Sequence, residues 1–182
     1  MLRGEFDLRG RRMKIDKLLC PLGLKNNPNR AMRELTHITI HCTGNYNATA
    51  GALNHARYQL NGSGGRSASW HYTVDRDFIY QSFDDDRECW HAGNARGNSC
   101  SIGIEICVND KPGFEIACNR AAWLVAFLVR KHNFNLDVIV QHCFWSGKNC
   151  PSELRSGVWG VTWESFLDMV KGYLGIFPAV LS

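Results

Sequence analysis

A run of apolar residues in the middle of the chain constrains its fold more than any other feature. Residues 101–108, SIGIEICV, are apolar at nearly every position, and Glu105 is the one charged residue among them. A nearly continuous apolar run is typical of a strand that is covered on both faces, as in parallel and mixed sheets. The run therefore predicts a central strand. A carboxylate inside such a strand is costly unless it faces a site or a partner.

The segments on either side of this run predict strands that are interleaved with helices. Strand patterns occur in LTHITIHCT from Leu35, in a hairpin over 69–75 and 78–83, and at 138–140. Helical spacing of apolar residues occurs at 49–60, with an N-cap at Asn47 or Thr49, and at 116–132 and 162–174. These patterns predict an α/β fold in which helices cover one central mixed sheet.

The length of 182 residues suits one domain. Residues 1–12, MLRGEFDLRGRR, are rich in charge and show no periodicity, so we expect a disordered or non-native leader before a domain of residues 13–182. Proline, glycine and asparagine residues within 20–33 predict a loop, and the regular elements of the fold are expected to begin after it.

Charge and cysteine content narrow the functional classes. A formal net charge of +4 falls short of a nucleic-acid footprint. Neither a membrane span nor the apolar core of a signal peptide is found, which predicts synthesis in the cytoplasm and no membrane insertion. The eight cysteines are scattered singly, several within apolar runs, so most are predicted to be reduced core residues.

The segment QHCFWSGKNCPSEL carries the strongest chemical signal. His142 and Cys150 are separated by seven residues, and Lys148 precedes the cysteine by two. Zinc accepts imidazole nitrogen and thiolate sulfur, and a catalytic zinc site has three protein ligands and one open position. His41, at the end of a predicted strand, is the best third candidate. The spacing alone is a weak signal, because histidines and cysteines are numerous in this chain.

Five motifs in order make the signal specific: HITIHCTGN, SWHYTVDRD, CWHAGN, NSCSIGIEIC and HCFWSGKNCP. Together they resemble the type 2 N-acetylmuramoyl-L-alanine amidases, a family that includes peptidoglycan recognition proteins and the catalytic domains of phage endolysins and autolysins. The resemblance covers roughly Leu35 to Trp163. It implies the amidase fold, Zn²⁺ held by His41, His142 and Cys150, and hydrolysis of the amide between N-acetylmuramic acid and L-alanine in bacterial peptidoglycan.

The resemblance also implies roles for the charged residues. Lys148 would stabilise the developing oxyanion, and Glu105 would be the general base. Some short phage amidases have a tyrosine in the hairpin strand, where this chain has Trp70. Tryptophan cannot exchange a proton in the useful pH range, so the departure leaves proton transfer to Glu105. A structural ion pair is the alternative interpretation of Glu105.

Substrate contacts are assigned to Trp70, His91 and Asn94, the last two in the WHAGN motif. His91 has an equally plausible interpretation as a hydrogen-bonded structural histidine. His71 is left without a role. The remaining histidines, His37, His55 and His132, are expected to be ordinary surface or packing residues.

Three alternatives to a wall-lytic enzyme stay open. A peptidoglycan-binding sensor of this fold lacks the zinc cysteine, whereas Cys150 is present. A cytosolic amidase that recycles soluble muropeptides would use the same metal and bond. A structural zinc site would need a fourth ligand such as Cys143, which points elsewhere if its segment is extended. A monomeric endolysin or autolysin, made without a signal peptide and acting on the wall after release, is preferred.

Overall fold

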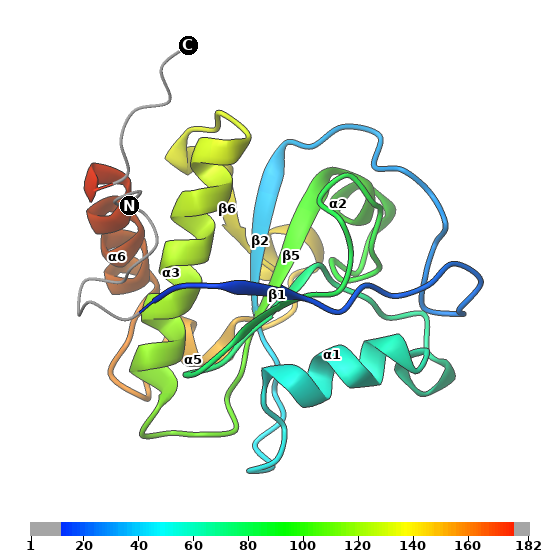
Figure 1. Ribbon diagram of the computed structural model, residues 1–182. Coiled ribbons are helices and arrows are strands. Elements are labelled where there is room, and N and C mark those ends of the chain that lie inside the picture. The colour runs from blue at the N-terminus through cyan, green and yellow to red at the C-terminus, as the bar shows by residue number, and fades with distance from the viewer. Residues whose placement is uncertain (1–11, 177–182) are drawn as a thin grey trace.

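The computed structural model describes residues 12–176, in which six strands form one mixed sheet with the order β1-β4-β3-β5-β2-β6 (Figure 1). The strands are β1 Ile15–Lys17, β2 His37–Cys42, β3 Tyr72–Val74, β4 Ile79–Gln81, β5 Ser101–Ile106 and β6 Ile139–Gln141. β5 lies between β3 and β2, and these three strands and β6 run parallel to one another. The predicted central strand and the mixed sheet are confirmed.

Helices cover this sheet. They are α1 Ala52–Leu60, α2 Ala95–Cys100, α3 Phe114–Lys131, α4 Cys143–Ser146, α5 Ser152–Ser156 and α6 Trp163–Ile176, with 3-10 turns at Ser63–Gly65 and Leu136–Val138. Figure 1 shows α3 against one face of the sheet, α6 on the outer side of α3, and α1 on the opposite side of the sheet. None of the described helices combines the length and the apolar character needed to cross a bilayer.

The core forms where β5 and β2 meet α3. Ile38 and Ile40 of β2 are fully buried in it, as are the isoleucines at alternate positions of β5. The predicted inward residues of α3 are also buried, namely Ala117, Ala121, Leu124, Val125 and Leu128. Because side chains alternate across a strand, burying these isoleucines sends His41 and Glu105 to the other face of the sheet.

One expectation about the N-terminal region is revised. The sheet does not begin at Leu35, because β1 pairs in parallel with β4 at the sheet edge, and Met13 is buried in the core. Three residues are too few to show periodicity, which is why β1 was not predicted. The predicted leader lies outside the described residues except for Arg12. All eight cysteines are free thiols and six of them are buried, which agrees with the prediction that most are reduced core residues.

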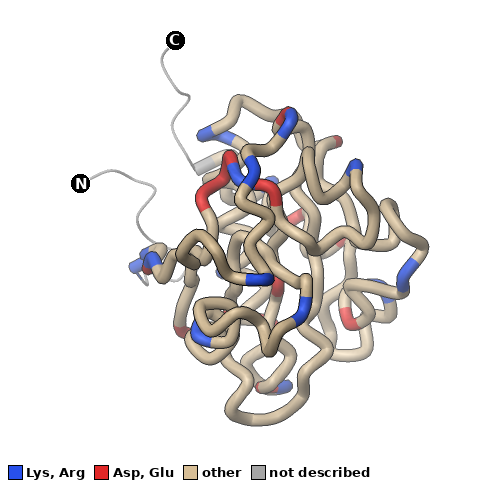
Figure 2. The backbone as a smooth tube through the Cα atoms, turned by 90° about the vertical axis from the view of Figure 1, so that its right-hand side faces the viewer, with Lys and Arg blue, Asp and Glu red and all other residues tan. Residues whose placement is uncertain are grey.

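Charged residues are distributed widely over the described part of the chain. Figure 2 shows lysine and arginine on many segments, interspersed with acidic positions.

The start of α1 corrects the predicted cap. The helix begins at Ala52 after Gly51, and neither Asn47 nor Thr49 caps it. The Asn47 carboxamide oxygen accepts instead from the Thr49 N–H and hydroxyl, which closes a local turn. The acceptor for the Ala52 N–H is Asp75 Oδ2, at 2.7 Å, from the β3–β4 hairpin. A distant carboxylate thus replaces the local cap.

We expect Asp75→Ala to lower the free energy of unfolding by about 1–2 kcal/mol, as loss of a helix cap does. Asp75 Oδ1 also accepts from the N–H groups of Asp77 and Phe78 in the hairpin turn, so both elements lose an acceptor. Chemical denaturation measures the change. Asp77→Ala is the matched control, since that side chain is 63% exposed and its nearest cation lies at 3.8 Å. Equal unfolding midpoints for the two variants would contradict this role of Asp75.

Candidate metal centre and active site

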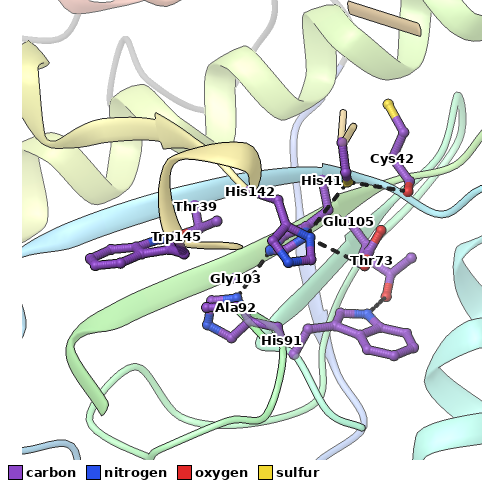
Figure 3. Close-up of polar contacts among 12 residues, drawn as sticks. Thr39, His41, Cys42, Thr73, His91, Ala92, Gly103, Glu105, His142 and Trp145 are labelled. Carbon is purple, nitrogen blue, oxygen red and sulfur yellow. Dashed lines mark hydrogen bonds and ion pairs between the residues drawn. The ribbon is translucent and has the colours of Figure 1, made fainter. Parts of the chain in front are cut away.

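Three potential metal-binding atoms converge at the carboxyl end of the central strands. His41 is on β2, His142 directly follows β6, and Cys150 precedes α5. His41 Nδ1 lies 3.0 Å from His142 Nδ1 and 3.8 Å from Cys150 Sγ, and all three residues are buried. Figure 3 shows the rings of His41 and His142 meeting beside Glu105 and His91. The structure thus brings together the three residues predicted as ligands.

The loop from His142 to Cys150 folds back on itself to bring its two ends together. The Cys143 N–H donates to the Cys150 carbonyl, at 3.1 Å, and Gly147 ends α4 with a φ of 72°, which favours glycine. Cys143 Sγ is directed away from the cluster and accepts from Arg155 Nη1 at 2.8 Å. Among the described residues Cys143 is not part of the cluster, which argues against it as the fourth ligand of a structural zinc site.

The donor set fits a zinc ion. Zn–N bonds of about 2.0–2.1 Å and Zn–S bonds of about 2.3 Å place the donors of a tetrahedral site roughly 3.3–3.6 Å apart. The observed separations of 3.0 and 3.8 Å bracket that range. Burial lowers the pKa of both His41 and His142, so each ring is a neutral lone-pair donor. Burial raises the pKa of Cys150 to about 12, so its thiolate needs a nearby cation.

A third imidazole contacts the cluster from outside. His91 Nδ1 lies 3.0 Å from His41 Nε2, and His91 Nε2 lies 3.1 Å from the Ser101 carbonyl oxygen. Burial, followed by the neighbouring His71 ring, lowers the pKa of His91 to about 3. Both ring nitrogens of a neutral His91 are therefore engaged within the protein. This arrangement favours the structural interpretation of His91 over direct substrate binding.

Glu105 lies on β5 directly opposite His41 in the parallel register. Its Oε1 is 3.9 Å from His41 Nδ1, and its Oε2 is buried with no hydrogen-bond partner among the described residues. Burial raises the pKa of Glu105 to about 8, against a smaller lowering by Lys148. Since His41 is neutral, the Glu105–His41 contact is not a salt bridge.

An open cleft of about 620 Å³ runs past Glu105 and Lys148. Trp70 lines this cleft, and its indole Nε1 donates to Thr73 Oγ1, which fixes the ring. A second hollow of about 490 Å³ also reaches Lys148 and is lined by His91 and His142. Lys148 is exposed between the two hollows, where its ammonium group can reach a bound substrate.

Asn94, which was predicted to contact substrate, makes two hydrogen bonds within the protein. Its side-chain oxygen accepts from the Gly97 N–H and caps α2, and its nitrogen donates to the Trp145 carbonyl. Both polar atoms are therefore used by the scaffold. The helix it caps was not predicted, because six polar and small residues carry no apolar periodicity.

Several cleft residues were missed by sequence reasoning. Arg66 and Tyr58 line the 620 Å³ cleft together with His55, which was expected to be an ordinary packing residue. Their only sequence signal was their position near the glycine-rich turn after α1, and such turns commonly carry binding residues. Of the other histidines, His71 is buried between the Gly103 N–H and the Arg87 carbonyl, and His132 contacts Asp85.

Comparison with known proteins shows which family the chain belongs to. The family model for N-acetylmuramoyl-L-alanine amidase matches residues 31–153, which contain all of the site residues described above. The chain belongs to this amidase family. Two curated members are XlyA of Bacillus subtilis, 44% identical over 154 residues, and CwlH of the same organism, 41% identical over 160 residues. These matches cover 84% and 86% of this chain but 49% and 61% of the two relatives, so the chain spans about half of XlyA.

Solved structures of amidase-family relatives share the fold. The catalytic domain of XlyA superposes with a TM-score of 0.77 at 41% identity, covering 86% of this chain and 99% of that domain. A mutant endolysin from Bacillus subtilis gives a TM-score of 0.78 at 40% identity, covering 87% and 99%. The chain therefore has the architecture of an amidase catalytic domain, as the motifs predicted.

The burial of Glu105 predicts a cost in stability when its carboxyl group ionises. Because the folded protein holds the Glu105 proton more tightly than the unfolded chain, deprotonation destabilises the fold as pH rises from about 4.5 towards 8. We expect Glu105→Gln to raise the unfolding free energy of the metal-free protein at pH 9, on the order of 1–3 kcal/mol, with little effect at pH 4. Denaturant unfolding at the two pH values measures the change.

Glu153→Gln is the control, and its unfolding free energy is expected to change in the opposite direction. Burial alone would raise the pKa of Glu153, but hydrogen bonds from Tyr46 and Ser152 lower it overall. Its carboxylate therefore stabilises the fold above its unfolded pKa, and the variant should be less stable at neutral and alkaline pH. A loss of stability in Glu105→Gln at pH 9 would refute the cost assigned to that carboxylate.

Proposed function

We propose that this domain is a zinc-dependent amidase that hydrolyses the bond between N-acetylmuramic acid and L-alanine in bacterial peptidoglycan. The observation that carries the proposal is the arrangement of Glu105. Its unpartnered carboxylate oxygen lies beside the His41, His142 and Cys150 donor set and at the edge of the 620 Å³ cleft. Metal donors, a proton acceptor and a substrate-sized cleft meet at one place.

Zinc held by these three residues would polarise the amide carbonyl and lower the pKa of water to about 7. Glu105 then removes a proton from the attacking water as the C–O bond forms. It returns that proton to the amide nitrogen as the C–N bond breaks. The products are the lactyl carboxylate of the muramic acid and a free L-alanine amine. Burial raises the pKa of Glu105 in the metal-free protein, and the charge of a bound zinc would offset part of that effect, so that the group could both take up and release this proton.

Lys148 stabilises the negative charge that develops on the carbonyl oxygen. It lines both hollows at the metal centre, so it can contact a substrate that extends into each of them. A fixed cation favours the transition state more than the neutral amide, which is the condition for raising the rate. Trp70 forms an apolar wall of the larger cleft, where tryptophan gives contact area without proton chemistry.

The names of the similar proteins support the proposal that this chain acts on the cell wall. The similar proteins carry the names N-acetylmuramoyl-L-alanine amidase and endolysin. We infer that this chain likewise cuts polymeric peptidoglycan after release from the cell that makes it, and that it works as a monomer. A sensor would bind the polymer without cutting it, and a recycling enzyme would cut only soluble muropeptides.

End-group analysis of digested peptidoglycan tests the reaction. New L-alanine amines without new reducing sugars, lost on treatment with a zinc chelator and restored by Zn²⁺, are the expected result. Reducing ends would refute the assigned bond, and binding without either product would indicate a sensor. Cleavage of soluble muropeptides alone would indicate a recycling enzyme.

The same assay on variants tests the roles of the residues. Cys150→Ser is expected to lose zinc and activity together, whereas Cys143→Ser, the matched control in the same loop, should retain both. Glu105→Ala should retain zinc but lose roughly 10²–10⁴-fold in turnover, the usual contribution of a general base. Wild-type turnover in Glu105→Ala would refute its role in proton transfer.

A further inference from the structure

We propose that His91 is a positioning residue for the metal centre, which holds the proton of the His41 ring on Nε2 and so directs the Nδ1 lone pair at the metal. The proposal rests on the proposed zinc function. It differs from the substrate contact predicted from the WHAGN motif, because His91 acts through another side chain.

The directions of the two hydrogen bonds of the His91 ring follow from the Ser101 carbonyl group, which has no proton to donate. The Ser101 carbonyl oxygen can only accept, so His91 Nε2 must donate to it across 3.1 Å. A neutral imidazole carries one N–H, which makes His91 Nδ1 an acceptor. The atom 3.0 Å away, His41 Nε2, must then be the donor. The remaining nitrogen of a neutral His41, Nδ1, has its lone pair facing His142 Nδ1 and Cys150 Sγ.

The fold provides a specific place for the His91 ring. A Cβ at position 103 on β5 would lie 2.7 Å from His91 Cγ, so only glycine leaves room for the ring against the sheet. The His91 N–H donates to Asn98 Oδ1, which ties the loop before α2 to that helix. His91 is therefore held at its backbone, at its ring face and at Nε2, which leaves Nδ1 aimed at His41.

Losing this acceptor removes the preference for one His41 tautomer. Without it, His41 can carry its proton on Nδ1, where the proton occupies the position of the metal and faces another imidazole nitrogen. Metal binding would then have to displace that proton or rotate the ring. Substitution of such outer partners of metal ligands costs about 10–100-fold in metal affinity.

Two substitutions separate the two hydrogen bonds of His91. In asparagine, Oδ1 stands near the position of His Nδ1, so His91→Asn keeps an acceptor for His41 and loses the donor to Ser101. In glutamine, Nε2 stands near the position of His Nε2, so His91→Gln keeps the donor and loses the acceptor. We expect His91→Gln to weaken zinc binding by about 10–100-fold and His91→Asn to bind much more tightly than His91→Gln. Competition with a chromophoric chelator gives both dissociation constants.

His71 offers a matched control. Its ring lies 5.9 Å from that of His91 and is also buried, but its two nitrogens contact the Gly103 N–H and the Arg87 carbonyl and not His41. His71→Gln should lower the unfolding free energy and leave zinc affinity unchanged. Equal zinc affinity in His91→Gln and wild type, or an equal loss in His91→Asn and His91→Gln, would overturn the proposal.

A second readout does not need the metal. Long-range ¹H–¹⁵N NMR of the metal-free protein reports which ring nitrogen of His41 is protonated. The expected result is Nε2 in the wild type and in His91→Asn, and a shift of protonation towards Nδ1 in His91→Gln. Failure of the wild type to bind zinc would refute the proposed function, whereas an unchanged His41 tautomer in His91→Gln would refute the role of His91 alone.

Discussion

The parallel pairing of β2 with β5 is the constraint on which the rest of the site depends. In this register His41 lies opposite Glu105, while Ile40 and Ile104 lie opposite each other on the face that packs towards α3. A slip of one residue would send the polar side chains of one strand into the core and its isoleucines to the cleft. Hydrophobic burial on one face therefore holds the metal donor and the proton acceptor together on the other.

The third strand of this group completes the donor set. β6 pairs in parallel with β2 and ends at Gln141, so the next residue, His142, emerges beside His41. The loop that follows returns Cys150 to the same place through a main-chain hydrogen bond. His41 and His142, 101 positions apart in the sequence, thus meet because parallel strands present their carboxyl ends at one edge of the sheet, and the loop adds Cys150 to the pair.

Burial sets the protonation states of these groups in the metal-free protein, and it suits the histidines better than the two acidic groups. The histidines are neutral, the Cys150 thiol is held protonated, and the Glu105 carboxyl resists ionisation, in each case mainly because water is excluded. A bound divalent cation would favour the thiolate and the carboxylate. Such a site is destabilising in the metal-free protein, which is the usual relation between stability and function.

The main strands and the long helices were predictable because burial of one face makes apolar residues recur at the spacing of a strand or a helix, and this spacing is visible in the sequence. α3 is an example, since its apolar spacing follows the face that contacts the sheet. The shorter elements were not predictable for the opposite reason. β1 and α2 are held by pairing and by capping, and the start of α1 depends on Asp75, more than twenty residues away.

Some residues of the candidate site were likewise predictable from the sequence, and others were not. His41, His142 and Cys150 were identified because five ordered motifs surround them, and the structure brings them together. The contacts of Asn94 and His91 depend on which partner each polar atom finds in three dimensions, and a motif does not specify that partner. Arg66 had only its place near a glycine-rich turn as a signal, and it is the folded chain that makes it line the same cleft as Trp70 and Glu105.

X-ray absorption at the zinc edge of the purified protein tests the central claim most directly. The account predicts one zinc ion per chain, with one sulfur neighbour at about 2.3 Å and nitrogen or oxygen neighbours at about 2.0–2.1 Å. Absence of a sulfur neighbour would remove Cys150 from the centre, and two sulfur neighbours would indicate a closed structural site. A chain that retains no zinc would contradict the account as a whole.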